Sequence, residues 1–264
     1  MDVNRQPVPP YEQLAHGYDL VMAHVDYADW AAFVHGLLWT HHPAPRRILE
    51  LGCGTGTFAL ELQPLGAYTY LASDASPAML EVARAKAAAA SLPVPVQFSH
   101  ADFTTFTVDE PVDVVMLLYD GLNYLLEPDQ VARLFEQTYQ ALKPGGVFFF
   151  DQSTPANSIN NAAYFEDQGE TEAFSYRRFS DYDAAAQLHT TSFEIEVGGQ
   201  TYAEQHVQRA YTLEAIGRLI DQTAFERVRT YDGFSDDQAD ERSERIHWVL
   251  RRPLGPAAET ERRS

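Results

Sequence analysis

The sequence predicts an α/β fold in which a mostly parallel β-sheet carries helices on both faces. Segments typical of strands alternate with segments typical of helices, the strand at residues 48–51 runs into a glycine-rich turn, and residues 111–118 are almost continuously apolar. Alternation of this kind favours a parallel sheet, and an unbroken apolar run is typical of a strand that is buried on both faces.

The glycine-rich turn is the most informative segment of the chain. Residues 48–57 read I-L-E-L-G-C-G-T-G-T, with glycine at positions 52, 54 and 56. Glycine can adopt positive φ and bring backbone N–H groups within contact of a ligand, which in an open α/β sheet binds beyond the carboxyl ends of the strands. The dinucleotide fingerprint is G-x-G-x-x-G, whereas the spacing here is G-x-G-x-G. A dinucleotide site and a turn without a ligand are the alternatives.

Glu50 completes an E-x-G-x-G-x-G motif, and with it the chain resembles the class I S-adenosylmethionine (SAM) dependent methyltransferases, in particular the bacterial small-molecule enzymes with the generic methyltransferase domain. The resemblance covers most of residues 11–251. It implies a Rossmann-like sheet with an antiparallel last strand and SAM as the cofactor. The cofactor-binding residues that it implies in this turn are Glu50, Gly52, Cys53, Gly54 and Gly56.

The second strand, Tyr68–Ser73, ends at Asp74. A carboxylate at this distance from the glycines can accept hydrogen bonds from both hydroxyls of a ribose, so Asp74 is the predicted ribose ligand, with Ala75 beside it. Capping of the next helix, together with Ser76–Pro77, is an alternative role for Asp74 and is compatible with the first. In the family an apolar residue at the position of Met79 covers the adenine.

The third strand, residues 94–99, leads to the next two cofactor-binding candidates, Asp102 and Phe103. In the family an acidic residue at the first position takes the adenine amino group, and the next backbone N–H faces the ring. A structural turn is the alternative role for Asp102, since Asp is common after strands.

The fourth strand, residues 111–118, is followed by the residues that the resemblance places beside the transferable methyl group. These catalytic candidates are Tyr119, Asp120 and Asn123, and Tyr119 is also expected to contact the cofactor. Asp120 could act as a general base or orient a substrate amine. Capping of the helix that follows is its alternative role.

The remaining core elements complete the predicted SAM-binding domain, which comprises residues 45–151 and 212–252. Leu142–Gly146 matches the family's L-K-P-G-G turn before a fifth strand. A helix at residues 213–223 and strands near 225–231 and 245–251 resemble the closing antiparallel hairpin of the family.

Residues 1–44 are predicted to form a helical lid over the cofactor. Residues 11–22 and 26–38 have apolar side chains at helical spacing, and Asp26 is a plausible cap for the second helix. The first segment resembles the Tyr-x-x-x-A/F-x-x-Y-D element of small-molecule methyltransferases. The resemblance implies that Tyr11 or Tyr18 approaches the cofactor or the substrate, with plain packing as the alternative.

Residues 152–211 are predicted to be a β-rich insertion. Three segments alternate in the manner of half-buried antiparallel strands, and Gly198–Gly199 forms a tight turn between the last two. Such a unit could build a wall of the substrate pocket, or its exposed edge could pair two copies as a homodimer. Its polar candidates, each of which could equally be structural, are Tyr176, Arg178, His189 and His206.

The composition of the chain limits the kinds of partner that it is expected to bind. The 264 residues include 19 basic and 38 acidic side chains, a formal charge of −19, which disfavours nucleic acid as a partner and does not exclude a neutral or cationic small molecule. One cysteine, and a His41–His42 pair without a third ligand, predict neither a disulfide nor a metal site. Without a signal peptide or a long apolar run, a cytoplasmic protein with no membrane partner is expected. Residues 1–10 and 253–264 are expected to be flexible tails.

The function implied by the resemblance is transfer of the SAM methyl group to an N, O or C atom of a small molecule. Two alternatives remain at this stage. One is another enzyme that uses the same pocket, of the aminopropyl or carboxymethyl type. The other is a SAM-binding protein without catalytic activity.

Overall fold

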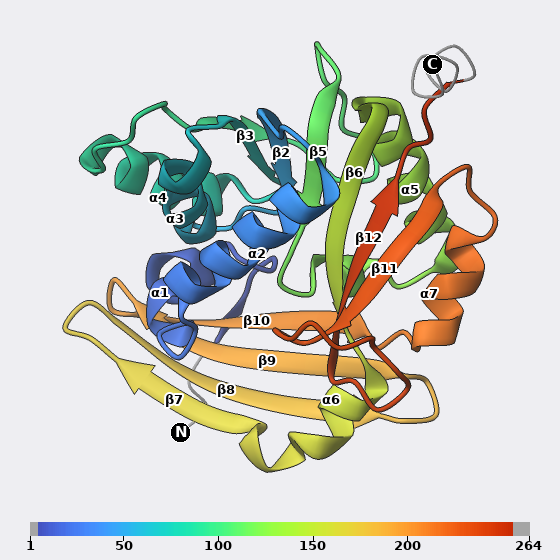
Figure 1. Ribbon diagram of the computed structural model, residues 1–264. Helices are drawn as coiled ribbons and strands as arrows, with labels where there is room; N and C mark the ends of the chain where they lie inside the picture. The colour runs from blue at the N-terminus through green and yellow to red at the C-terminus, as the bar shows by residue number, and fades with distance from the viewer. Residues whose placement is uncertain (1–4, 256–264) are drawn as a thin grey trace.

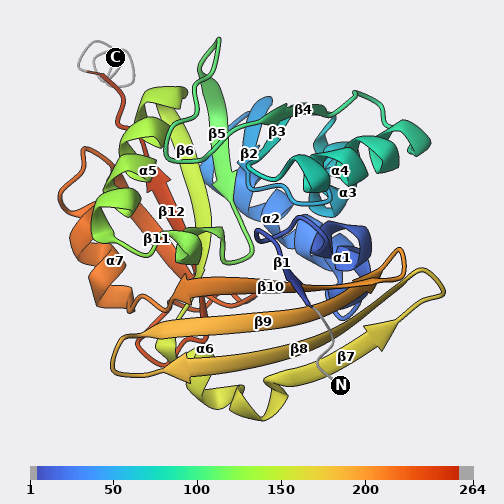
Figure 2. The same cartoon turned by 180° about the vertical axis from the view of Figure 1, so that it is seen from behind.

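The computed structural model describes residues 5–255, which form two β-sheets with flanking helices (Figure 1). One sheet has seven strands and the other has five. The strands of the five-stranded sheet run across one end of the seven-stranded sheet, as the views from both sides show (Figures 1 and 2). No helix within residues 5–255 has the length and apolar character needed to cross a membrane.

The seven-stranded sheet has the order β11-β12-β6-β5-β2-β3-β4. Neighbouring strands from β6 to β4 pair in parallel, whereas β12 is antiparallel to both β6 and β11. The predicted Rossmann-like sheet, mostly parallel and with an antiparallel closing hairpin, is therefore confirmed. Its strands are β2 (Arg47–Leu51), β3 (Thr69–Asp74), β4 (Gln97–His100), β5 (Val112–Leu117), β6 (Leu142–Ser153), β11 (Glu226–Asp232) and β12 (Arg245–Arg251).

Helices cover both faces of this sheet because its strands are apolar on both sides. In β6, Val147 and Phe149 face one layer of helices, and Phe148 and Phe150 face the other. The first layer is α2 (Tyr27–His41), α3 (Thr57–Gly66) and α4 (Pro77–Ala89). The second layer is α5 (Pro128–Ala141) and α7 (Leu213–Ile220). As predicted, the Asp26 carboxylate caps α2 by accepting a hydrogen bond from the Asp29 amide at 2.9 Å.

The five-stranded sheet has the order β1-β10-β9-β8-β7, and the strands from β10 to β7 are antiparallel. The predicted β insertion is thus confirmed, and Gly198 and Gly199 form its turn with φ of 60° and 74°. The structure adds two strands that were not predicted, β1 and β7. The sheet comprises β1 (Gln6–Pro7), β7 (Glu166–Glu170), β8 (Phe174–Asp183), β9 (Leu188–Val197) and β10 (Gln200–Arg209).

The N-terminal segment fills the space between the two sheets. It is less helical than predicted, because only Leu14–Gly17 (η1, a 3-10 turn) and Tyr18–Val21 (α1) are helical before α2. Leu14 and Val21 pack on the inner face of the five-stranded sheet. The expected tail at residues 1–10 is wrong in part, since Gln6–Pro7 pairs in parallel with β10.

Three short elements complete the described chain. They are η2 (Gly121–Tyr124), α6 (Pro155–Asn160) and η3 (Ala162–Tyr164). Residues 1–4 and 256–264, which belong to the two expected tails, lie outside the described residues.

Candidate functional site

A cavity of about 300 Å³ lies over the carboxyl ends of β2 and β3, around the glycine-rich turn. From the turn and its strand, the predicted residues that line it are Glu50, Gly52, Cys53 and Gly54. Those that line it from elsewhere are Tyr18, Asp74, Ala75, Met79, Phe103 and Tyr119. We call this space the cofactor cavity.

Gly54 gives the cofactor cavity a wall without a side chain. Its φ is +55°, and a Cβ added to it would meet only the Tyr18 ring, at 3.9 Å, so the space beside it is open. The Gly54 amide donates to Asp74 Oδ2 at 2.8 Å, and the Cys53 amide donates to the Ser73 carbonyl at 2.9 Å. These two N–H groups therefore already have protein partners, contrary to the expectation that they bind the ligand. The turn instead lets a ligand come close to the backbone at Gly54, where no side chain stands in the way.

The structure places two of the predicted cofactor residues outside the lining of the cavity. Gly56 allows close packing against α4 and β4, since a Cβ there would lie 3.1 Å from the Ala83 Cβ and 3.3 Å from the Phe98 ring. Asp102 is exposed, and its Oδ1 accepts hydrogen bonds from the Thr104 amide and hydroxyl. Its contact with adenine stays a prediction.

Glu50 is a buried acid in the wall of the cofactor cavity. Its side chain accepts a hydrogen bond from the Tyr70 hydroxyl at 2.8 Å. Burial raises the pKa of Glu50 to about 7, although the Tyr70 hydrogen bond opposes the shift. Near neutral pH the carboxyl group is therefore poised between its protonated and charged forms.

SAM affinity is expected to rise with pH through the pKa of Glu50. Because SAM carries a sulfonium and an ammonium group, it favours the charged carboxylate, so binding releases a proton below pH 7. The dissociation constant should fall by up to about tenfold per pH unit below about pH 7 and level off above it. Calorimetric titration at several pH values checks this. Glu50→Gln keeps an acceptor for the Tyr70 hydroxyl and should make the dissociation constant for SAM independent of pH in this range. The same pH dependence as in the wild type would show that Glu50 is not its cause.

A second cavity, of about 380 Å³, lies between the end of the seven-stranded sheet and the inner face of the five-stranded sheet. We call it the acceptor cavity. Of the polar candidates in the insertion, Arg178, His189 and His206 line it, because alternate residues of β8, β9 and β10 share the inner face. Tyr176 does not line this cavity, and its hydroxyl donates to Asp167 at 3.3 Å.

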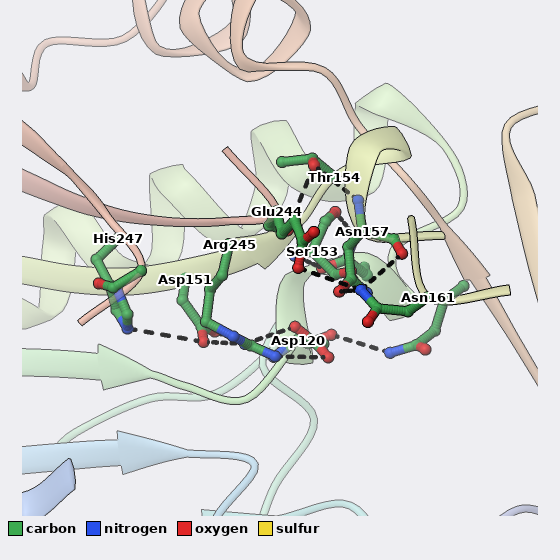
Figure 3. A network of polar contacts seen from close by, with 12 residues as sticks. Asp120, Asp151, Ser153, Thr154, Asn157, Asn161, Glu244, Arg245 and His247 are labelled. Carbon is green, nitrogen blue, oxygen red and sulfur yellow. Dashed lines mark hydrogen bonds and ion pairs between the residues drawn. The ribbon is translucent and has the colours of Figure 1, made fainter. Parts of the chain in front are cut away.

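Asp120 forms part of a buried ion network in the wall of the acceptor cavity (Figure 3). Arg245 lies between two carboxylates, with its Nη1 2.7 Å from Asp120 Oδ1 and also paired with Asp151 Oδ2. Asp151 in turn accepts a hydrogen bond from the Asp120 amide at 3.0 Å. Burial raises the pKa of both carboxyl groups, and the guanidinium opposes this rise. Asp120 does not cap η2 through its side chain, so that alternative is not seen.

The other two catalytic candidates differ in what their side chains do. Tyr119, which has a φ of +59°, lines both cavities, and the Arg245 guanidinium lies 5.1 Å from the centre of its ring. Asn123 lines only the acceptor cavity. Its amide nitrogen donates to the Ser153 and Arg209 carbonyls at 2.8 and 2.7 Å, and its oxygen accepts from the Ser153 amide. This arrangement makes Asn123 an anchor between β6 and β10.

Four tyrosines stand where the two cavities meet. Each of them lines both the cofactor cavity and the acceptor cavity, and we call them the tyrosine junction: Tyr11, Tyr18, Tyr119 and Tyr124. Burial raises the pKa of all four phenols, so the junction is uncharged at neutral pH. Tyr11 is within ring contact of Tyr18 and Tyr124, with centroids 5.9 and 5.8 Å apart.

Comparison with known proteins agrees with the fold and the cofactor cavity. A family model described as a methyltransferase domain matches residues 48–146. The chain is also similar to the solved structure of an SAM-dependent methyltransferase from Clostridium acetobutylicum ATCC 824, with a TM-score of 0.76, 23% identity, and coverage of 92% of this chain and 99% of that one. The chain thus contains a methyltransferase domain and has the fold of a SAM-dependent methyltransferase, and these findings support SAM as its cofactor.

Two relatives within this class match most of the chain. YqeM of Bacillus subtilis (strain 168), whose name proposes methyltransferase activity, is 29% identical over 241 residues, which cover 89% of this chain and 94% of YqeM. The cypemycin N-terminal methyltransferase of a Streptomyces species is 28% identical over 223 residues, covering 81% of this chain and 86% of that protein. The similarity therefore extends beyond the cofactor domain into the lid and the insertion.

The residues present fit SAM. Gly54 leaves one side of the cofactor cavity open, the Asp74 carboxylate lines it, and Met79 and Phe103 supply apolar surface. SAM supplies a methyl group that its sulfonium already activates for transfer to a nucleophile. The protein has to hold that group, align the acceptor and exclude water.

Sequence reasoning missed several residues of the site. Tyr27 and Trp30 of α2 line the cofactor cavity, and Tyr124 of η2 belongs to the junction. Tyr124 could have been suspected from its place shortly after the fourth strand. Glu204 of β10, a buried residue whose carboxylate lies 3.3 Å from His206 Nε2, gave no signal, because a single glutamate in a strand of mixed polarity is ordinary.

Proposed function

We propose that the enzyme transfers the SAM methyl group to a nitrogen or oxygen atom of a small polar molecule held in the acceptor cavity. The tyrosine junction carries this proposal, because it is the place where a methyl group would pass from one cavity to the other. The faces of aromatic rings stabilise a nearby cation, here the sulfonium of SAM. Because the four phenols are uncharged, they do so without forming an ion pair with it.

The acceptor cavity supports a polar acceptor of modest size. Its volume of about 380 Å³ lies within the range of small-molecule sites. Hydrogen-bonding side chains such as Asn157, His189 and Gln208 line it. The chain's charge of −19 favours a neutral or cationic acceptor over a polyanion. The Streptomyces relative, which is named as an N-terminal methyltransferase, supports an amine as one class of acceptor.

Labelled SAM tests the proposal. The enzyme is incubated with methyl-labelled SAM and a panel of small amines, phenols and sugars, and products are separated by chromatography and weighed by mass spectrometry. We expect a gain of one CH₂ unit in at least one compound, with one S-adenosylhomocysteine formed per product. Transfer of an aminopropyl or carboxymethyl group, or no product across the panel, would contradict the proposal.

A further inference from the structure

A chain of four polar side chains leads away from the tyrosine junction. It consists of Tyr11 from the N-terminal segment, Tyr124 from η2, and His206 and Glu204 from β10. The Tyr11 and Tyr124 hydroxyls are hydrogen-bonded to each other. The Tyr124 hydroxyl lies 3.0 Å from His206 Nδ1, and His206 Nε2 lies 3.3 Å from Glu204 Oε2. We call these four residues the relay.

The carboxylate at the end of the relay fixes the direction of its hydrogen bonds. Glu204 accepts hydrogen bonds from the amides of Tyr11, Gln13 and Leu14, and as a carboxylate it has no proton to donate. His206 Nε2 must therefore carry a hydrogen, which leaves the Nδ1 lone pair of the neutral ring to accept from the Tyr124 hydroxyl. The Tyr124 oxygen then accepts from the Tyr11 hydroxyl. One lone pair of Tyr11 remains free to accept a further proton.

The free end of the relay lies where an acceptor would sit. Tyr11 and Tyr124 belong to the tyrosine junction, and His206 lines the acceptor cavity although its side chain is only 3% exposed. The rings of Tyr11 and His206 are in edge-to-face contact, with centroids 4.6 Å apart. Glu204 is fully buried. The relay thus joins the junction to a base that is shielded from water.

Asp120, the acid that the sequence suggested as a base, is less suited to this task. Its two oxygens lie 2.7 and 3.3 Å from the Arg245 guanidinium. Although burial raises the pKa of Asp120, proton uptake by this carboxylate would weaken its ion pair with Arg245. The imidazole of His206, by contrast, is hydrogen-bonded to a phenol and a carboxylate.

We propose that the relay takes up the proton that the acceptor loses, carrying it from the Tyr11 hydroxyl to His206. The inference rests on the proposed function. When an N–H or O–H group gains a methyl group, the new bond to carbon forms as the carbon–sulfur bond breaks, the sulfonium charge is lost and one proton is released. That proton moves to Tyr11, the Tyr11 proton to Tyr124, and the Tyr124 proton to His206 Nδ1. The imidazolium that results is paired with Glu204.

The two phenols pass the proton on and do not retain a charge. Burial raises the pKa of Tyr11 and Tyr124 well above the ordinary value, so neither stays ionised near neutral pH. Each phenol gains one proton as it gives up another. The titratable groups in contact with His206 are Glu204 from its own strand, Tyr124 from η2 and Tyr11 from the N-terminal segment. From β9, the Phe193 ring packs against His206 and Thr191 is its cross-strand partner. The other titratable or charged residues that line the same cavity include Asp120, Arg178, His189 and Arg245.

Nitrogen NMR of the free enzyme tests the relay without any acceptor. His206 should give the pattern of a neutral ring that is protonated at Nε2, assigned by its loss in His206→Gln. In Glu204→Gln the oxygen can still accept from the Gln13 and Leu14 amides, and the new NH₂ group takes the place of the oxygen that binds the Tyr11 amide and faces His206. This NH₂ group should donate to Nε2 and so move the ring proton to Nδ1. A wild-type ring protonated at Nδ1, or an unchanged ring in Glu204→Gln, would overturn the proposed direction.

Steady-state kinetics test the catalytic role of the relay. The substrate is the compound of the acceptor panel that gives the most product. Tyr124→Phe keeps the ring and removes the link between Tyr11 and His206, so kcat should fall about 100-fold, as for loss of general base catalysis. In the wild type, kcat should fall at acid pH, where an imidazole is protonated and cannot act as a base. This fall should be absent in Tyr124→Phe. SAM affinity should be unchanged. Tyr202→Phe is the matched control, since Tyr202 lies on β10 outside both cavities and its hydroxyl binds Gln200.

The outcomes separate the relay from the proposed function. Normal kcat and an unchanged pH profile in Tyr124→Phe would overturn the relay and leave methyl transfer to a small molecule intact. Absence of product across the whole panel with the wild-type enzyme would overturn the proposed function, and the catalytic role of the relay with it. A fall in kcat that leaves the pH profile unchanged would show a structural role for Tyr124 and would also contradict the relay.

Discussion

Gly54→Val is expected to abolish measurable SAM binding while the domain still folds. The added Cβ points into the open side of the cofactor cavity, and its two methyl groups take the space that the ligand needs. We expect affinity to fall at least about 100-fold, which corresponds to about 2.7 kcal/mol. A branched residue at a φ of +55° also costs about 1–3 kcal/mol of stability. Isothermal titration with SAM, alongside urea unfolding, measures both effects.

Gly198→Val is the matched control for this prediction. Gly198 has a φ of +60°, close to that of Gly54, but it lies in the β9–β10 turn and has no atom within 4 Å of an added Cβ. The control should therefore lose similar stability and keep its SAM affinity. If both variants bound SAM as the wild type does, the glycine turn would not be the wall of the cofactor site.

Arg245→Met should destabilise the protein by about 3–5 kcal/mol, the usual cost of removing one partner from a buried ion pair. Arg245 holds two carboxylates, and the side chains of Arg245, Asp120 and Asp151 are 21%, 17% and 0% exposed. Without the guanidinium, the two buried acidic groups lose the cation that pairs with both of them. Urea unfolding at neutral pH measures the loss.

The loss in Arg245→Met should shrink as the pH falls. Without Arg245, burial raises the pKa of Asp120 and Asp151 further, so the folded state binds more protons than the unfolded state between the two pKa values. Stability then rises as the pH falls through the folded-state pKa. Arg218→Met removes an exposed pair with Glu214 and should cost less than about 1 kcal/mol at any pH. A loss of that size in Arg245→Met would contradict the role given to the ion network.

The cofactor half of the site could be predicted from the sequence because its signals are local. Gly52, Gly54 and Asp74 follow directly on strands whose apolar character is plain, and the ends of parallel strands must meet at one edge of the sheet. Sequence spacing alone did not reveal that the Gly54 amide would donate its hydrogen bond to the Asp74 carboxylate. That hydrogen bond depends on how two neighbouring strands end relative to each other.

The acceptor half could be predicted only in outline. His206 was a candidate among several polar residues, and its partner Tyr124 is 82 residues away in the chain. The two meet because the five-stranded sheet docks across the end of the seven-stranded sheet, an arrangement that no local pattern encodes. Likewise β7, with the sequence E-D-Q-G-E, has no apolar alternation, and it was missed for that reason.

The N-terminal segment shows how tertiary contacts override local expectation. Residues 11–22 have helical spacing, yet the amides of Tyr11, Gln13 and Leu14 bind the buried Glu204 carboxylate and do not all enter a regular helix. Gly17 allows close contact with the Phe174 ring, which an added Cβ would meet at 2.0 Å. The N-terminal segment is therefore held against the insertion by contacts that become apparent only in the folded chain.

A crystal structure with S-adenosylhomocysteine bound, soaked together with an acceptor from the panel, tests the central claim most directly. We expect the adenosine in the cofactor cavity, with its ribose hydroxyls hydrogen-bonded to Asp74. The sulfur should lie at the tyrosine junction, and the acceptor N or O atom should lie on the other side of that junction, in the acceptor cavity. A ligand sulfur that lies away from the four tyrosines, or an acceptor bound outside the second cavity, would contradict it.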